Sequence, residues 1–257
     1  MTFVRFFFRV LSFIVWFSIL IIPFLLARWP YPEAAKGIAK LWNKGACYIV
    51  GLKVNYFGDF SHNKPLLIIS NHTSYLDIPV LGSICSFSFI SKKEVMTWPV
   101  IGWLAKMCDT VFVERRPIKS REQVSQLRRC VLGDRKLVLF AEGTTTDGSK
   151  VLPFKSSLLE FVFTEGIVDE FHIQPVTILC PDLSCSSSKT SLDAFYPWYD
   201  ETSLGVHFFR LLMRKRTHVN VFFHAPERAS FFQGRKELAN WAQQHVESGH
   251  KQILQSS

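Results

Sequence analysis

The longest uninterrupted apolar stretch of the chain lies near its N-terminus, at residues 10–27. It contains no charged residue, and as a helix it would reach about 27 Å, close to the hydrocarbon core of a bilayer. Arg5 and Arg9 precede the stretch, and Arg28 follows it. The stretch is long for a signal peptide and has no small-residue cleavage site after it, so we expect a membrane-binding helix that is retained. A buried core helix is the alternative.

Residues 33–50 predict a second, amphipathic helix. Apolar residues recur at helical spacing on one side, and lysines occupy other positions, at Lys36, Lys40 and Lys44. Residues 1–50 are therefore interpreted as membrane-anchoring helices. A single span would place the rest of the chain outside the cytoplasm, whereas a shallow helix pair would leave it on the cytosolic face. Arg5 and Arg9 favour a cytoplasmic N-terminus, but Arg28 and the three lysines weaken the charge asymmetry.

From residue 51 to residue 257, short apolar runs alternate with longer periodic segments. The short runs predict strands at 52–57, 65–70, 87–91, 110–113, 137–141, 174–179 and 218–223. The periodic segments predict helices at 75–85, 98–107, 121–132, 156–164, 204–214 and 235–246. This alternation predicts one α/β domain, 51–257, in which helices flank a mixed central sheet.

Composition narrows the classes of partner. The chain is 48% hydrophobic, contains 24 phenylalanines and has a formal net charge of +9. A basic, phenylalanine-rich protein favours an anionic membrane surface or an anionic substrate. Nucleic acid is not expected, because the sequence has no zinc-finger spacing, no RNP-like aromatic motif and no long basic run.

A polar cluster, Asn71–Asp77 (NHTSYLD), follows the apolar run at 65–70. Histidine is well suited to accept a proton near neutral pH, and a carboxylate on its second ring nitrogen fixes the tautomer and stabilises the imidazolium. No activated serine or cysteine motif accompanies His72 and Asp77, so the histidine is expected to act directly on a substrate hydroxyl. The alternative is a histidine that only satisfies a polar position at a strand end.

Three further segments place polar residues beside apolar runs. Residues 111–116 (VFVERR) end in guanidinium groups, whose planar fork of donors suits phosphate. Residues 140–148 (FAEGTTTDG) form a glycine-containing turn whose amides could line an anion site. Residues 173–178 (IQPVTI) form an apolar strand with one proline. Taken singly, each is also compatible with an ordinary strand end, turn or core strand.

In this order, the four segments resemble the four motifs of the glycerolipid acyltransferases of the lysophosphatidate type. The resemblance covers residues 71–178 and implies the mixed α/β fold of the glycerol-phosphate acyltransferases. It implies that His72 is a general base held by Asp77. It also implies that Arg115 binds the phosphate of the acceptor's head group.

The third and fourth segments carry the remaining residues that the resemblance identifies. Glu142, Gly143 and Thr144 would bind the acceptor or order the site. Pro175 would help to shape the site of the acyl chain, although this match is the weakest of the four.

The third segment also departs from the family pattern. Ala141 stands in place of the usual proline, and Thr145 in place of the usual arginine. Losing the arginine removes an expected phosphate contact, and Lys155 in the following segment could partly restore the positive charge. The identity of the acceptor head group is therefore open.

The resemblance implies acyl transfer from a thioester to the free hydroxyl of a lysolipid, with no cofactor and no metal. The donor would be coenzyme A or acyl carrier protein thioester, and no obligate protein partner is expected. The favoured acceptor is 1-acylglycerol-3-phosphate, which gives phosphatidate, and lyso-ornithine lipid is the alternative. The expected location is a bacterial inner membrane, with the catalytic domain on the cytoplasmic side.

Two interpretations from other classes remain open at this point. One is a metal-dependent hydrolase that uses His72, Asp77 and Glu142 as ligands. The other is a non-catalytic lipid-binding protein that keeps the fold, although retention of both His72 and Asp77 disfavours it.

Overall fold

A computed structural model describes residues 2–98, 101–107, 109–113, 133, 135–164, 168–181, 196–214 and 216–255. The described helices are α1 (Thr2–Ala27), α2 (Pro32–Val50), α3 (Asp77–Ile84), α4 (Ile101–Met107), α6 (Leu204–Met213) and α7 (Arg235–Gln255). Three short 3₁₀ segments accompany them, η1 (Lys93–Thr97), η2 (Ser156–Phe163) and η4 (Ala229–Phe231).

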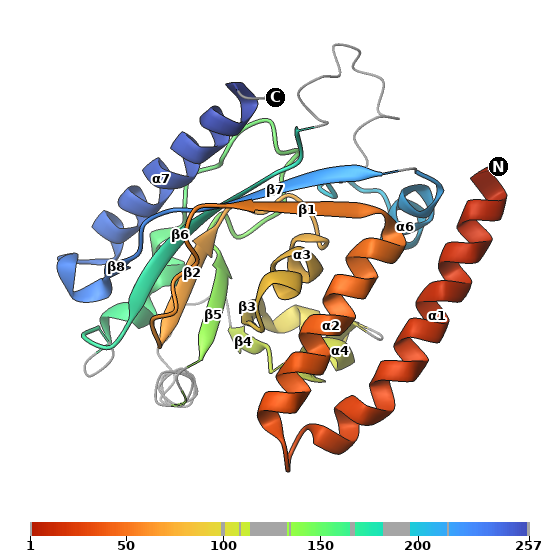
Figure 1. The fold of residues 1–257 in the computed structure, drawn as a ribbon. Coiled ribbons are helices and arrows are strands. Elements are labelled where there is room, and N and C mark those ends of the chain that lie inside the picture. The colour runs from red at the N-terminus through yellow and green to blue at the C-terminus, as the bar shows by residue number, and fades with distance from the viewer. Residues whose placement is uncertain are drawn as a thin grey trace.

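The first two helices form an antiparallel hairpin at one side of the molecule (Figure 1). Pro32 starts α2 in the first turn, where its missing N–H costs nothing, and Gly51 ends it in the left-handed conformation with φ 87°. Within Phe3–Ala27, an 18-residue window has a mean hydropathy of 2.6, and only 6% of that window is buried in the protein. The helix is therefore no core helix, and by length and composition it could cross a membrane.

Arginines hold both ends of α1 against the rest of the chain. Arg5 and Arg9 donate to the carbonyl groups of residues 212–214, over distances from 2.6 to 3.1 Å, and so cap the C-terminal end of α6. At the other end, Arg28 forms an ion pair of 3.0 Å with Asp109. Helix α1 consequently lies along the domain.

The described residues form an eight-stranded sheet, which is mixed, as predicted, and has one strand more than the seven expected. Its strands are β1 (Leu52–Phe57), β2 (Leu66–Ser70), β3 (Ser88–Lys92), β4 (Val111–Val113), β5 (Lys136–Phe140), β6 (His172–Leu179), β7 (Thr217–Phe223) and β8 (Glu227–Arg228). The order is β1-β7-β6-β2-β5-β3-β4, and β8 pairs with β6. All neighbours are parallel except β7 and β8, which run antiparallel to β6.

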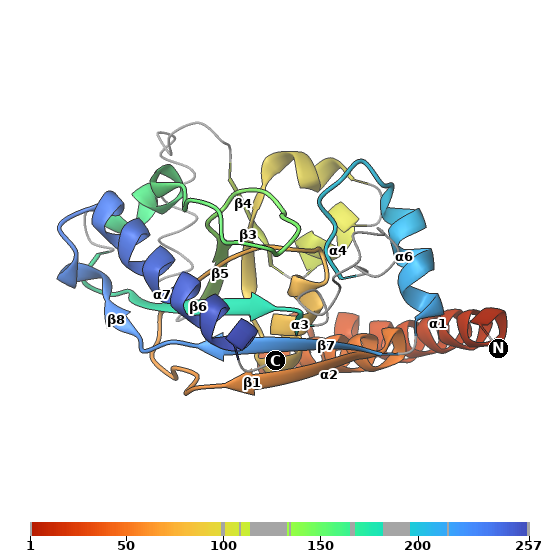
Figure 2. The ribbon, with the colours of Figure 1, turned by 90° about the horizontal axis from the view of Figure 1, so that it is seen from above.

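Helices cover both faces of the sheet (Figure 2). On one face, α7 and η2 pack over Leu67 and Ile69 of β2. On the other face, α2, α3 and α6 pack over Leu66 and Ile68. Because successive residues of a strand point to opposite faces, a strand covered on both sides reads as a continuous apolar run, as Leu66–Ile69 of β2 do before the buried Ser70.

Two predicted helices differ from the structure. The segment expected as a helix at 156–164 is the 3₁₀ segment η2, since apolar spacing of three, as between Leu159 and Val162, fits a three-residue turn as well as an α-turn. Helix α7 continues to residue 255, beyond the predicted end at 246. The extension is polar in sequence, but His250 is buried and its Nε2 donates to the carbonyl of Gly148 at 2.9 Å. The helix predicted at 121–132 lies outside the described residues.

Candidate active site

The site forms at the carboxyl ends of β2 and β5, where the sheet presents two neighbouring loops. Asn71 follows β2, and its side-chain amide pairs with the backbone of Ile178 in both directions, at 2.8 Å each. The amide thus acts as one more rung of the β2–β6 ladder, and it is buried. This pairing fixes the point at which the main chain leaves the sheet, and therefore the position of the backbone of the next residue, His72.

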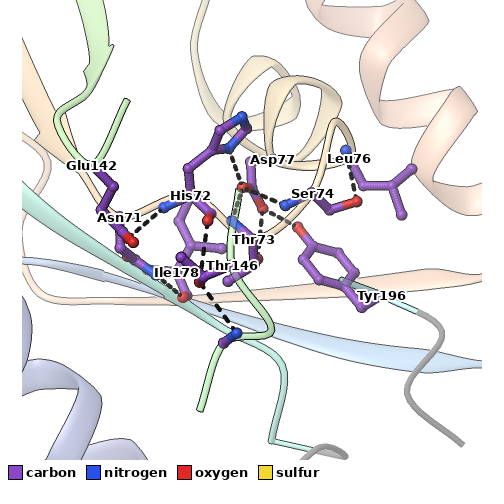
Figure 3. Close-up of polar contacts among 11 residues, drawn as sticks. Asn71, His72, Thr73, Ser74, Leu76, Asp77, Glu142, Thr146, Ile178 and Tyr196 are labelled. Carbon is purple, nitrogen blue, oxygen red and sulfur yellow. Dashed lines mark hydrogen bonds and ion pairs between the residues drawn. The ribbon is translucent and has the colours of Figure 1, made fainter. Parts of the chain in front are cut away.

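His72 and Asp77 meet across the turn that connects β2 to α3. Nδ1 of His72 lies 2.7 Å from Oδ2 of Asp77 (Figure 3). The carboxylate oxygen only accepts, so Nδ1 carries the proton and Nε2 of the neutral ring is the basic nitrogen. Five positions would not bring two side chains together on an ideal helix, and the turn before Asp77 supplies the missing rotation.

The Asp77 carboxylate is completely buried and fully engaged. Besides the imidazole, Oδ2 accepts the backbone N–H groups of Thr73 at 2.9 Å and of Ser74 at 3.1 Å. Oδ1 accepts the hydroxyl of Tyr196 at 2.7 Å and, at 3.4 Å, that of Thr73. Several donors around one carboxylate fix its orientation.

The reactive side of the histidine ring stays open. The ring stacks on Phe140 with centroids 3.9 Å apart, and the side chain is 18% exposed. Within the described part of the chain, no residue bonds Nε2, the atom that a general base must present to its substrate. The ring is thus held on one edge and one face, and its other edge faces outward.

The third sequence segment supports the backbone of the first. Glu142 is 1% exposed, and its carboxyl accepts the N–H of His72 at 2.9 Å and that of Leu152 at 3.3 Å. The carbonyl of His72 in turn accepts the N–H of Thr146 at 3.0 Å. Burial raises the pKa of Glu142 to about 7; the two amide bonds and Lys155 counter this effect, and the charge of Asp77 adds to it. In this structure Glu142 therefore contacts the backbone of the His72 loop and of Leu152.

The other predicted site residues are placed as follows. Gly143 has a φ of 68°, which favours glycine, and a Cβ there would lie 3.1 Å from the Nζ of Lys155. Thr144 is exposed on the same turn. Pro175 is buried within β6, opposite Ile69. Arg115 lies outside the described residues.

Sequence reasoning missed Tyr196. It contacts Asp77 from a position 119 residues further along the chain, within an aromatic run that carries no chemical motif. No sequence signal connected it with the first segment. Among the described residues no group of three or more His, Cys, Asp or Glu side chains is arranged to hold a metal ion. Glu142 points at backbone amides, and is not arranged with His72 and Asp77 as a set of ligands.

The fold and site define an α/β protein with a histidine–carboxylate pair at the strand ends. The family model described as Acyltransferase matches residues 53–179. The lyso-ornithine lipid O-acyltransferase of Rhodobacter capsulatus is 36% identical over 183 residues, which cover 71% of this chain and 64% of that protein. That of Brucella abortus is 35% identical over 213 residues, covering 81% of this chain and 78% of the relative.

A solved structure shares the whole fold. The 1-acyl-sn-glycerophosphate (LPA) acyltransferase of Thermotoga maritima superposes with a TM-score of 0.67 at 20% identity, covering 98% of both chains. The chain belongs to the glycerolipid acyltransferase family, as its motifs predicted.

Proposed function

We propose that this protein transfers an acyl group from a thioester to the free hydroxyl of a lysolipid, and that the His72–Asp77 pair carries the reaction. The observation behind this is the 2.7 Å contact that places the proton on Nδ1 and leaves Nε2 open. Nε2 takes the proton of the acceptor hydroxyl, and the oxygen attacks the thioester carbonyl. The tetrahedral intermediate collapses, the carbon–sulfur bond breaks, and the thiol leaves with the proton from the imidazolium.

The preferred acceptor in this proposal is lyso-ornithine lipid. The two relatives named above are lyso-ornithine lipid O-acyltransferases. Thr145 also lacks the guanidinium that would suit a phosphate, and an ornithine head group has no phosphate. Lysophosphatidate is the second candidate, favoured by Arg115 and by the net charge of +9. The donor is the thioester of coenzyme A or of acyl carrier protein.

A parallel assay tests both the activity and the acceptor. Detergent-solubilised protein is given a labelled acyl thioester together with lyso-ornithine lipid or lysophosphatidate. We expect faster transfer to lyso-ornithine lipid, and a loss of roughly 10²–10⁴-fold in His72→Ala, since the general base is removed. The Thr145→Arg variant should shift the preference towards lysophosphatidate. An active His72→Ala enzyme contradicts the mechanism, and a preference of the unaltered protein for lysophosphatidate overturns the acceptor assignment.

We further propose that α1 lies in one leaflet of a bacterial inner membrane, with the catalytic domain on the cytoplasmic side. The arginine contacts at both ends keep α1 beside the domain, while its large apolar side chains face outward. A cysteine at Tyr31, in the turn after α1, should not react with an impermeant maleimide added from the periplasmic face. Labelling from that face would instead mean that α1 crosses the bilayer.

A further inference from the structure

Tyr196 is the least expected member of the site. Its side chain is completely buried, and its hydroxyl lies 2.7 Å from Oδ1 of Asp77. It reaches the carboxylate from the side away from His72 (Figure 3). The phenol and the imidazole therefore bond to the two different oxygens of one buried carboxylate.

The Asp77 oxygens are unequally supplied with donors. Oδ2 has three close partners, the imidazole and two backbone amides. Oδ1 has Tyr196 at 2.7 Å and only the Thr73 hydroxyl at 3.4 Å besides. Without the phenol, Oδ1 would keep one long hydrogen bond in a site closed to water. Leaving a buried carboxylate oxygen without a close hydrogen-bond donor costs considerable free energy. The carboxylate therefore keeps the orientation in which Oδ1 accepts the Tyr196 hydroxyl.

The segment that carries Tyr196 is attached to the first motif independently of that hydroxyl. The N–H of Trp198 donates to the carbonyl of Thr73 at 2.8 Å. Nε2 of His207 donates to the carbonyl of Pro197 at 2.9 Å, so its Nδ1 accepts the hydroxyl of Tyr75, 3.1 Å away. The Trp198–Thr73 and His207–Pro197 contacts, neither of which uses the hydroxyl of Tyr75, would keep the aromatic ring in place if its own hydroxyl were removed.

We propose that Tyr196 is a positioning residue of the reaction: its hydroxyl holds the Asp77 carboxylate in the orientation that aligns His72 and withdraws part of its charge from the imidazole. The inference rests on the proposed function of the His72–Asp77 pair. The described titratable groups around Asp77 include His72, Tyr196 and Glu142, and the thiols of Cys180 and Cys47 face Tyr196. Burial, followed by the charge of Asp77, raises the pKa of Tyr196 well above its ordinary value, so the phenol remains a donor at neutral pH.

The Tyr196→Phe variant removes the hydroxyl and keeps the ring. We expect kcat to fall roughly tenfold, the low end for loss of a hydrogen bond to a charged group, with both KM values within about twofold. The carboxylate then attracts the protonated imidazole more strongly. The acidic limb of the pH–rate profile should therefore move to higher pH, by on the order of half a pH unit.

The matched control is Tyr75→Phe, which removes another partly buried tyrosine hydroxyl of the same region, one that bonds His207 and not Asp77. It should leave the acidic limb and kcat close to those of the unaltered protein. Equal losses in both variants would mean that buried phenols matter here only for packing, and that result overturns the proposal. Unchanged kcat and acidic limb in Tyr196→Phe overturn it as well.

A spectroscopic readout separates this inference from the proposed function. The Nδ1 proton of His72, followed by NMR, should move downfield in Tyr196→Phe because its carboxylate partner becomes a stronger acceptor, and should not move in Tyr75→Phe. This comparison needs no turnover. If the unaltered protein transferred no acyl group, the proposed function would fail, and the proton resonance would still decide whether Tyr196 positions the pair.

A second variant covers the case in which Tyr196→Phe does not fold. Incorporation of 3-fluorotyrosine at position 196 gives a more acidic phenol of nearly the same size, and therefore a stronger donor. The acidic limb should then move in the opposite direction, to lower pH. A shift to higher pH, or none, contradicts the proposal.

Discussion

Two buried titratable groups should give opposite pH dependences of stability that cancel in the unaltered protein. Glu142 is 1% exposed, and burial is the main reason that its pKa is raised from 4.5 to about 7. His224 is 9% exposed, and its pKa is lowered from 6.5 to about 4 by burial and, secondarily, by the charge of His245. An acid whose pKa is raised and a base whose pKa is lowered both favour their neutral forms, but they respond oppositely to pH.

The signs follow from which state binds the proton more tightly. The folded protein retains the Glu142 proton, so this group's stabilisation is complete below pH 4.5 and is lost as the pH rises to about 7. The unfolded chain binds the His224 proton more tightly, so that group's contribution is present above pH 6.5 and is lost as the pH falls to about 4. At roughly 1.4 kcal/mol per pH unit, each contribution amounts to about 3 kcal/mol at most. Their sum stays within about 1 kcal/mol of a constant value.

Replacing one of the two groups at a time should reveal the pH dependence of stability that the other contributes. Thermal unfolding in detergent is measured from about pH 4 to about pH 7.5 for Glu142→Gln and His224→Gln. Relative to the unaltered protein, the Tm of Glu142→Gln should rise across this range by roughly 6–12 °C, and that of His224→Gln should fall by a similar amount. Glu201→Gln, at an exposed carboxylate, is the control and should follow the unaltered protein. Flat difference curves, or curves of the same sign, would refute the assignment of buried neutral groups.

Two further predictions concern packing. Asn71→Ala leaves the buried N–H and C=O of Ile178 without their side-chain partners, which should lower the free energy of unfolding by about 2–4 kcal/mol. Because the loop that carries His72 would be displaced, turnover should fall as well. Denaturant unfolding and activity assays on the same samples check both effects. Gly249→Ala should destabilise the protein, because a Cβ there would lie 2.5 Å from Oγ1 of Thr177. Gly37→Ala is the control: a Cβ there has no neighbour within 4 Å, so the substitution should be neutral or stabilise the helix by up to about 1 kcal/mol. A stabilised Gly249→Ala protein would contradict this packing argument.

Most of the sheet could be predicted because buried strands require short runs of apolar residues, which are visible in the sequence. A strand such as β2, covered on both faces, is mostly apolar, and the seven predicted strands agree with the structure within two residues at each end. The strand that was missed, β8, is the polar pair Glu227–Arg228, which pairs with the end of β6 through its backbone. Backbone pairing of two polar residues leaves no periodic pattern to detect.

The candidate site was predictable only where chemistry is concentrated in a short segment. His72 and Asp77 were identified together because both lie within one loop. Tyr196 is 119 residues from Asp77 in sequence, and Ile178 is 107 residues from Asn71. Neither residue type indicates by itself that it bonds to a catalytic loop. An isolated tyrosine in an aromatic run is most often core, and only the folded arrangement shows that its hydroxyl reaches Asp77.

The structure also explains how acceptor preference could change while the chemistry stays constant. The pair formed by His72 and Asp77 is fixed by hydrogen bonds from the loops after β2 and β5 and from Tyr196, and most of these partners are buried. In contrast, Thr144 and Lys155 are exposed at the neighbouring turn, and Thr145 is only half-buried. A substitution in a buried network costs several hydrogen bonds, whereas one at an exposed turn costs little. Under the proposed function, replacing the family's arginine by Thr145 would therefore alter head-group recognition without disturbing His72.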